Sequence, residues 1–152
     1  VLSDGSVTAP KQPAFSVHKN STDQNDLAAG DVTVTWTHER FDQNANFDLT
    51  NNRFVAPVTG KYQLQASLRF NDLDADHTYM MVVIYTSNEN YRFIIDPDFG
   101  QDAAFFTISG RILADMDAGD TATIGVNSAS GATQSDIEGD AEYTHFSGFL
   151  AC

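Results

Sequence analysis

The sequence is poor in cysteine and in basic residues. Its single cysteine, Cys152, is the last residue of the chain, so no intrachain disulfide can form. The 152 residues carry 8 Lys and Arg against 21 Asp and Glu, which gives a formal net charge of −13. Because phosphate and anionic lipid are bound through Lys and Arg, we expect neither nucleic acid nor a membrane surface as a partner. A cationic partner, a neutral glycan or a divalent cation fits this charge, and so does a charge that only keeps the protein in solution.

Long apolar runs are missing as well. No stretch approaches the eighteen or so apolar residues of a membrane helix, so no membrane insertion is expected. The first residues have neither an initiator Met nor a signal-peptide pattern, and we expect the chain to be a piece of a longer protein. Residues 1–12 are polar and predict a linker from an upstream region, whereas residues 13–152 have the size of one domain.

The hydrophobic pattern has a period of two almost everywhere, with no helical stretch. In residues 61–70 the apolar side chains alternate with polar ones, which predicts a half-buried strand. Eight to ten such segments with regular turns predict an all-β sandwich, barrel or jelly roll. The expected strands are residues 14–18, 32–36 (with Trp36 in the core), 53–57, 61–70, 79–85 (buried on both faces), 91–95, 104–113, 121–126 and 144–151.

Catalytic motifs are also lacking. The four histidines are spread over different expected strands and loops, and none forms a metal-binding motif. Ser147 lacks the first glycine of the nucleophile elbow and has no helix after it. We therefore predict that the protein is not an enzyme.

Several landmarks together resemble the globular head of complement C1q and the related tumour-necrosis-factor-like domains. They cover residues 13–151 in the family's order and with plausible spacings. They are the opening Pro13-Ala14-Phe15-Ser16-Val17, then Phe41 and Asn46-Phe47-Asp48, the core segment at residues 52–62, the turn Ala118-Gly119-Asp120, and the closing His145-Phe146-Ser147-Gly148-Phe149-Leu150.

The resemblance implies a ten-stranded jelly-roll sandwich whose first and last strands are neighbours, assembled as a homotrimer around an apolar axis. It also implies Ca²⁺ near the apex of the trimer, with Asp96, Asp98 and Asp102 as candidate ligands and Gly100 allowing a sharp bend. Pro97 departs from the family at a position where relatives have a polar ligand. The alternative is that this acidic segment is a solvated turn.

The resemblance further implies a recognition or adhesion head at the end of a fibre or stalk, of phage tail-fibre or bacterial surface type. Its location would be extracellular or on a virion surface, and its ligand a glycan or a protein. Two alternatives stay open: a soluble secreted lectin-like protein, and a structural cap that only trimerises a stalk. Any ligand is expected at the polar loops 71–76 and 128–142, since a rigid sandwich presents its variable loops at its ends.

Overall fold

Strands form all the regular structure of residues 11–152, the part of the chain that the computed structural model describes. No helix occurs there, and so none that could cross a membrane. The all-β prediction is confirmed, with twelve strands where the resemblance implied ten; two of the twelve have only two residues each. The strands are β1 (Ala14–His18), β2 (Gly30–Thr33), β3 (His38–Gln43), β4 (Phe47–Asp48), β5 (Arg53–Val55), β6 (Gly60–Leu73), β7 (His77–Thr86), β8 (Asn90–Ile95), β9 (Ala103–Met116), β10 (Thr121–Ser130), β11 (Asp136–Ile137) and β12 (His145–Leu150).

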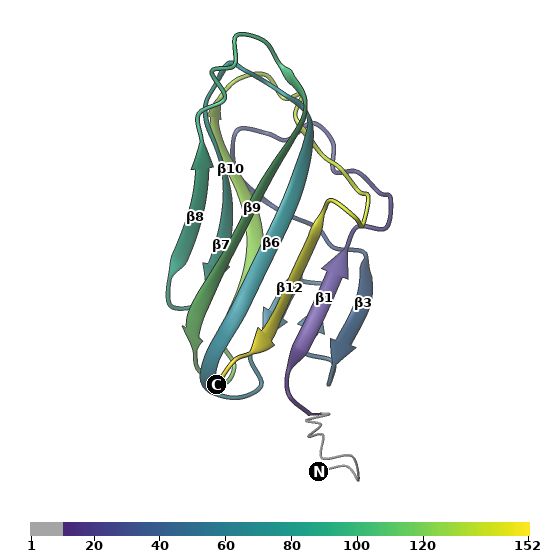
Figure 1. The fold of residues 1–152 in the computed structure, drawn as a ribbon, viewed down its shortest axis with the longest axis vertical. Helices are drawn as coiled ribbons and strands as arrows, with labels where there is room; N and C mark the ends of the chain where they lie inside the picture. Colours follow the sequence, from purple (N-terminus) through teal and green to yellow (C-terminus); the bar gives the residue numbers. More distant parts are fainter. Residues whose placement is uncertain (1–10) are drawn as a thin grey trace, which may run out of the picture.

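The strands form two antiparallel sheets that face each other as a jelly-roll sandwich (Figure 1). The first sheet, called sheet A, has the order β11-β6-β12-β1-β3. β11 and β12 pair with successive parts of β6, and β9 pairs with nearly the whole length of β6. The second, sheet B, has the order β4-β5-β10-β7-β8, with β2 paired to β10. β1 pairs with β12, which confirms that the first and last strands are neighbours.

The core lies between the sheets and is rich in aromatic rings. Phe15 of β1 stacks on Phe54 of β5, with ring centroids 4.6 Å apart, and meets the edge of Phe146 at 4.9 Å. These rings come from both sheets, so they join the two layers directly. Trp36 is buried, as expected. The alternation predicted for residues 61–70 is confirmed, because five β6 side chains are fully buried: Tyr62, Leu64, Ala66, Leu68 and Phe70.

Gly148 allows β12 to approach β6 closely. A Cβ at this position would lie 2.6 Å from Cδ2 of Leu64 and 2.9 Å from the carbonyl oxygen of Gln63. A side chain there would force the strands apart, so the glycine of the closing motif is required by packing.

Several strand bounds differ from those expected, the short β4 and β11 were not expected, and three further differences have a clear physical reason. β2 ends at Thr33, although Val34 and Trp36 remain buried beyond it. β3 was not expected, because most of its side chains are exposed and give no alternating apolar signal. In β7 the outward side chains are partly exposed, except for Val83, which is fully buried.

Candidate recognition surfaces

Three loops gather at the end of the sandwich opposite to the end where β1 begins (Figure 1). They join β6 to β7, β8 to β9, and β10 to β12, and we call this end the apex. Asp102 ties them together: its Oδ1 accepts a hydrogen bond from the backbone N–H of Ala75 at 3.0 Å, and its Oδ2 one from Nε2 of Gln134 at 2.8 Å. These bonds lower the pKa of the Asp102 carboxyl. Hydrogen bonds of Asp102 therefore hold the three loops of the apex together.

The candidate calcium ligands lie in the β8–β9 loop. Gly100 has a φ of 76°, so this loop does make the sharp bend that was expected. Oδ1 of Asp96 accepts the backbone N–H of Asp98 at 3.3 Å, and Asp102 turns its carboxylate toward the two protein donors. Within residues 11–152 no group of three or more His, Cys, Asp or Glu side chains is arranged to hold a metal ion. In this arrangement one chain alone does not fit calcium, and calcium binding stays a prediction.

A serine, a histidine and an aspartate also meet below the apex, but in a structural arrangement. Nε2 of His77 lies 3.2 Å from Oγ of Ser135, and Nδ1 of His77 lies 2.8 Å from the carbonyl oxygen of Ser130. Asp74 instead accepts hydrogen bonds from the backbone of Asp76 and Ala132. Ser135 is fully buried and the histidine is oriented by a carbonyl rather than a carboxylate, so this group lacks the access and the geometry of a hydrolytic triad.

Three of the four histidines, which sequence reasoning left scattered, form one row on the outer face of sheet A. His18 of β1 is paired with His38 of β3 on one side and with His145 of β12 on the other. The rings of His18 and His38 stack with centroids 5.8 Å apart. Burial, followed by the charge of Arg40, lowers the pKa of both His18 and His145. Neighbouring first and last strands place His18 and His145 on adjacent strands but do not give their register, and His38 needed the unexpected β3.

The outer face of sheet A also exposes large apolar side chains, which we call the outer apolar residues: Phe41, Phe105, Leu113 and Phe149. Their exposed fractions are 53%, 67%, 58% and 45%. Phe149 and Leu113 lie in one cross-strand row, because both are paired with Gln63 of β6. Side chains of this size rarely remain in water together on one sheet unless another surface covers them.

The apical end of the same face holds a charged and aromatic cluster. The guanidinium of Arg69 lies 4.4 Å from the ring centroid of Phe105 and 4.1 Å from that of Tyr143. Its Nη2 is also 2.7 Å from a carboxylate oxygen of Glu138. The cation lies between two ring faces, which keeps Phe105 in a fixed, outward position.

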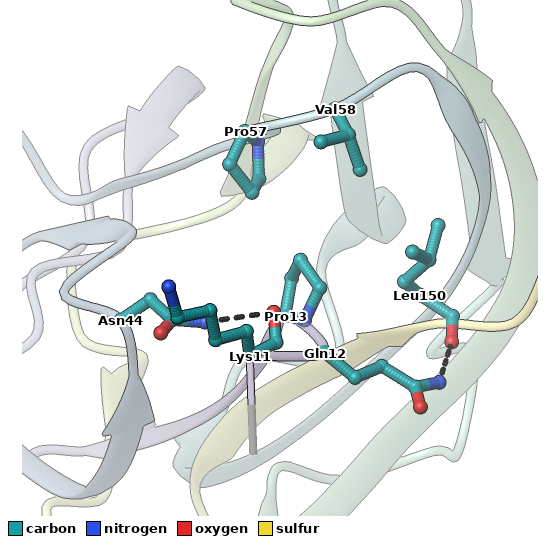
Figure 2. A pocket seen from close by; sticks show the side chains of 7 residues that line it. All are labelled: Lys11, Gln12, Pro13, Asn44, Pro57, Val58 and Leu150. Atoms are coloured by element: carbon teal, nitrogen blue, oxygen red, sulfur yellow. Dashed lines mark hydrogen bonds between the residues drawn. The ribbon is translucent and has the colours of Figure 1, made fainter. Parts of the chain in front are cut away.

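A groove of about 820 Å³ lies at the base, where the chain enters β1 (Figure 2). Two hydrogen bonds fix its edge, from Nε2 of Gln12 to the Leu150 carbonyl at 2.6 Å and from Nδ2 of Asn44 to the Lys11 carbonyl at 2.9 Å. Lys11 and Gln12, assigned to the linker, thus contact the domain; residues 1–10 of that linker lie outside the described residues. The groove is mainly apolar and suits an apolar side chain. Its lining residues are Lys11, Gln12, Pro13, Asn44, Pro57, Val58 and Leu150.

The fold is a β-sandwich module with several distinct exposed surfaces. Within residues 11–152, the serine, histidine and aspartate side chains that meet do not have the geometry of a catalytic site. A model of the C1q domain family matches residues 14–151, so the chain belongs to the C1q domain family. The domains of this family and of the tumour necrosis factor relatives are generally non-enzymatic recognition modules.

Solved structures agree with this fold. The globular domain of zebrafish complement 1qA protein is 20% identical, with a TM-score of 0.66 over 93% of this chain and 98% of that one. Murine APRIL at pH 8.0 is 13% identical, with a TM-score of 0.67 over 92% of this chain and 99% of that one. Among curated protein sequences, no match is found.

Proposed function

We propose that the protein is a homotrimeric, non-enzymatic recognition head that works outside the cell or on a virion surface. It belongs at the end of a fibre or stalk and binds a surface glycan or protein. The single observation that carries the trimer is the exposure of the outer apolar residues on sheet A. A homotrimer of this small domain removes these side chains from water, which stabilises it by about 25 cal/mol for each Å² buried.

The non-enzymatic part of the proposal is supported by the surroundings of the side chains that could otherwise act in catalysis. Ser135 and His77 are buried beneath the apical loops. The histidine row has Arg40 beside it, and Oγ1 of Thr37 lies 3.1 Å from Nδ1 of His38, but within residues 11–152 no carboxylate bonds to these histidines to orient them. The apex is a polar surface held by hydrogen bonds rather than a concave catalytic site, which favours binding over chemistry.

Absolute mass from light scattering tests the trimer. We expect about three times 16.6 kDa at micromolar concentration, and a lower mass on dilution if the affinity is modest. A mass of 16.6 kDa at every concentration contradicts the trimer and leaves only the family assignment.

Calcium is tested in the same samples with and without a chelator. Binding through Asp96, Asp98 and Asp102 requires a change in the β8–β9 loop or ligands from other copies, since the carboxylates do not converge in one chain. If calcium is bound, the melting temperature falls on chelation and the fall disappears in Asp98→Asn. An unchanged melting temperature removes calcium from the proposal and keeps the trimer.

The sequence placed the ligand at residues 71–76 and 128–142, but β6 extends to Leu73, β10 to Ser130, and β11 spans Asp136–Ile137. The recognition part is therefore tested by exchanging only residues 74–76 and 131–134 for short Gly-Ser turns, which spares the buried Leu73 and Ile137. Since Asp74 and Ser135 brace this region, the mass and melting temperature of the loop-exchanged protein are measured first. A folded trimer that loses adhesion to its target surface places the ligand at the apex, and one that keeps it places the ligand elsewhere on the head.

A further inference from the structure

Tyr85 lies flat across a strand on the outer face of sheet B. Its hydroxyl donates a hydrogen bond to Oδ1 of Asp31 at 2.5 Å. Tyr85 is on β7 and Asp31 on β2, and β10 lies between these two strands. The ring therefore has to cross over β10 to reach its partner.

Gly125 of β10 makes room for the ring. A Cβ at this position would lie 2.6 Å from Cε2 of Tyr85, closer than any real contact allows. A glycine inside a strand weakens the sheet, and it is used where another group approaches the backbone closely. Tyr85 is half-buried, so the sheet covers one side of the ring while part of it remains in contact with solvent. The result is a rigid aromatic floor on an otherwise open face.

Polar groups form a rim at one side of this floor. Oδ1 of Asp31 also accepts a hydrogen bond from Nδ2 of Asn127 at 2.7 Å. The bond from Tyr85, then that from Asn127, hold the pKa of the Asp31 carboxyl below its ordinary value, and the charge of Arg92 adds to this. Burial and then Asp31 raise the pKa of Tyr85 to about 12. At neutral pH the rim thus presents a carboxylate, an amide and a protonated phenol. Asp31 is exposed, and within residues 11–152 its Oδ2 has no donor.

The site is also preorganised. Val83, paired with Gly125, is fully buried although it lies outside the core between the sheets. Val83 and the ring of Tyr85 therefore pack down on the sheet before any ligand arrives. Preorganised groups lose little conformational entropy on binding, which favours affinity.

We infer that Tyr85, Asp31 and Asn127 form a binding subsite for a neutral saccharide, a site and ligand class that rest on the proposed recognition function. The face of an aromatic ring carries negative charge density and attracts the polarised C–H groups on the flat side of a pyranose. A carboxylate and an amide at the rim accept from and donate to neighbouring hydroxyls. The net charge of −13 and the ionised Asp31 repel sialylated and sulfated sugars, which leaves neutral ones.

The position on sheet B suits the proposed trimer. The outer apolar residues are on sheet A, so trimer formation through them leaves Tyr85 accessible on all three copies. Three weak saccharide subsites on one head raise the overall binding to a glycan-covered surface without any new contact.

The test is binding of the wild-type trimer to an array of oligosaccharides that end in glucose, galactose, mannose or N-acetylhexosamine, together with sialylated and sulfated versions. We expect binding to at least one neutral glycan. Tyr85→Ala and Gly125→Ala should each reduce its affinity at least tenfold, and Tyr85→Phe, which keeps the ring and loses the hydroxyl, only a few fold.

Tyr79→Ala is the matched control, because Tyr79 is a half-buried tyrosine on the same face of the same strand and, within residues 11–152, bonds to neither Asp31 nor Asn127. It should bind as the wild type does. Mass and melting temperature are recorded for every variant, so that loss of fold is not read as loss of the site.

Two results overturn the inference. If glycan binding is equal in Tyr85→Ala, Gly125→Ala and Tyr79→Ala, the saccharide site is elsewhere and the recognition function stands. If a wild-type trimer binds no neutral glycan, or only anionic ones, the ligand class is wrong, while the mass of the same sample separately decides the trimer.

Discussion

The two outer faces of the sandwich differ in how far their apolar and aromatic side chains are exposed. On sheet A, Phe41, Leu113 and Phe149 stand in water, each about half exposed. On sheet B, Tyr85 lies down on Gly125 and Val83 is fully buried. Sheet A thus leaves several large apolar side chains uncovered for another protein surface, whereas sheet B leaves Ile94 of β8 exposed but covers Val83 and part of the Tyr85 ring and presents polar groups beside them. In the proposed head, sheet A serves self-assembly and sheet B serves ligand binding.

Both assignments follow from the cost of exposed apolar area. A monomer gains nothing from the exposed side chains of sheet A, but a trimer gains from each Å² that it buries. Tyr85 has a fixed hydrogen-bond partner and a recess beneath its ring, so no second copy is needed to satisfy it. The following changes separate the two faces, from the largest expected effect to the smallest.

Charged residues on sheet A should abolish the trimer. Leu113→Asp combined with Phe149→Asp puts two carboxylates in one cross-strand row of the proposed interface. Burying unpaired charges costs several kcal/mol, so we expect the mass to fall from about three times 16.6 kDa to 16.6 kDa in light scattering. The control is Thr33→Asp, an exposed position on the outer face of sheet B, which should leave the mass unchanged. Equal masses for both variants would remove the distinction between the faces.

Removal of the aromatic floor should lower stability without changing the mass. Tyr85→Ala loses the bond to Asp31 and the packing of the ring on Gly125, and we expect a loss of about 1–3 kcal/mol in the free energy of unfolding by urea denaturation. Tyr85→Phe should lose about 0.5–1.5 kcal/mol, because only the hydrogen bond is removed. A fall in mass for either variant would mean that sheet B takes part in assembly.

Acid should weaken the protein through the histidine row of sheet A. The folded protein holds the pKa values of His18 and His145 below those of the unfolded chain, so the unfolded chain binds protons first as the pH falls below about 6.5. The melting temperature is therefore expected to be highest above this pH and to decline toward pH 5. The lowered pKa values of Asp31, Asp48 and Asp102 act only at still lower pH.

His18→Gln with His145→Gln should flatten this decline between pH 7.5 and pH 5. His77→Gln is not a suitable control, because His77 is buried and bonded within the apex. The single His38→Gln serves instead, and should flatten the decline less than the double variant. A decline that is unchanged in the double variant would place the acid sensitivity outside this row.

The smallest effect is expected at the ion pair of Lys61 and Asp115 near the base of sheet A. Their charged atoms are 2.6 Å apart, but the two side chains are 47% and 70% exposed. Exposed pairs contribute about 0–1 kcal/mol, so Lys61→Ala should change the melting temperature very little. A large loss, or a lower mass, would show that the trimer interface extends to this end.

The sequence predicted the sandwich because its strongest signals are local. The alternation in β6 identified both faces of the strand, and the motif glycine Gly148 marked a close approach. β3 was missed because an exposed strand at the edge of a sheet has no reason to alternate. The segment of Val34 and Trp36 was extended too far, since burial continues after the ladder ends.

The surfaces were harder to predict because they combine residues that are distant in the chain. Tyr85 and Asp31 meet only through the register of β7, β10 and β2, which no local pattern gives. The candidate ligands Asp96, Asp98 and Asp102 were close in sequence, yet the carboxylates of Asp96 and Asp102 bond to backbone and amide donors. Short spacing brings carboxylates near each other, but the loop decides where they point.

Hydroxyl-radical footprinting of the unmodified protein, read by mass spectrometry, tests the division between the two faces most directly. It compares side-chain oxidation in the wild type and in the Leu113→Asp, Phe149→Asp variant. We predict that Phe41, which is 53% exposed in a single chain, is protected in the wild type and oxidised in the variant, while Tyr85 is oxidised equally in both. Equal oxidation of Phe41 in both proteins, or protection of Tyr85 in the wild type, would contradict the assignment of sheet A to assembly and sheet B to the ligand.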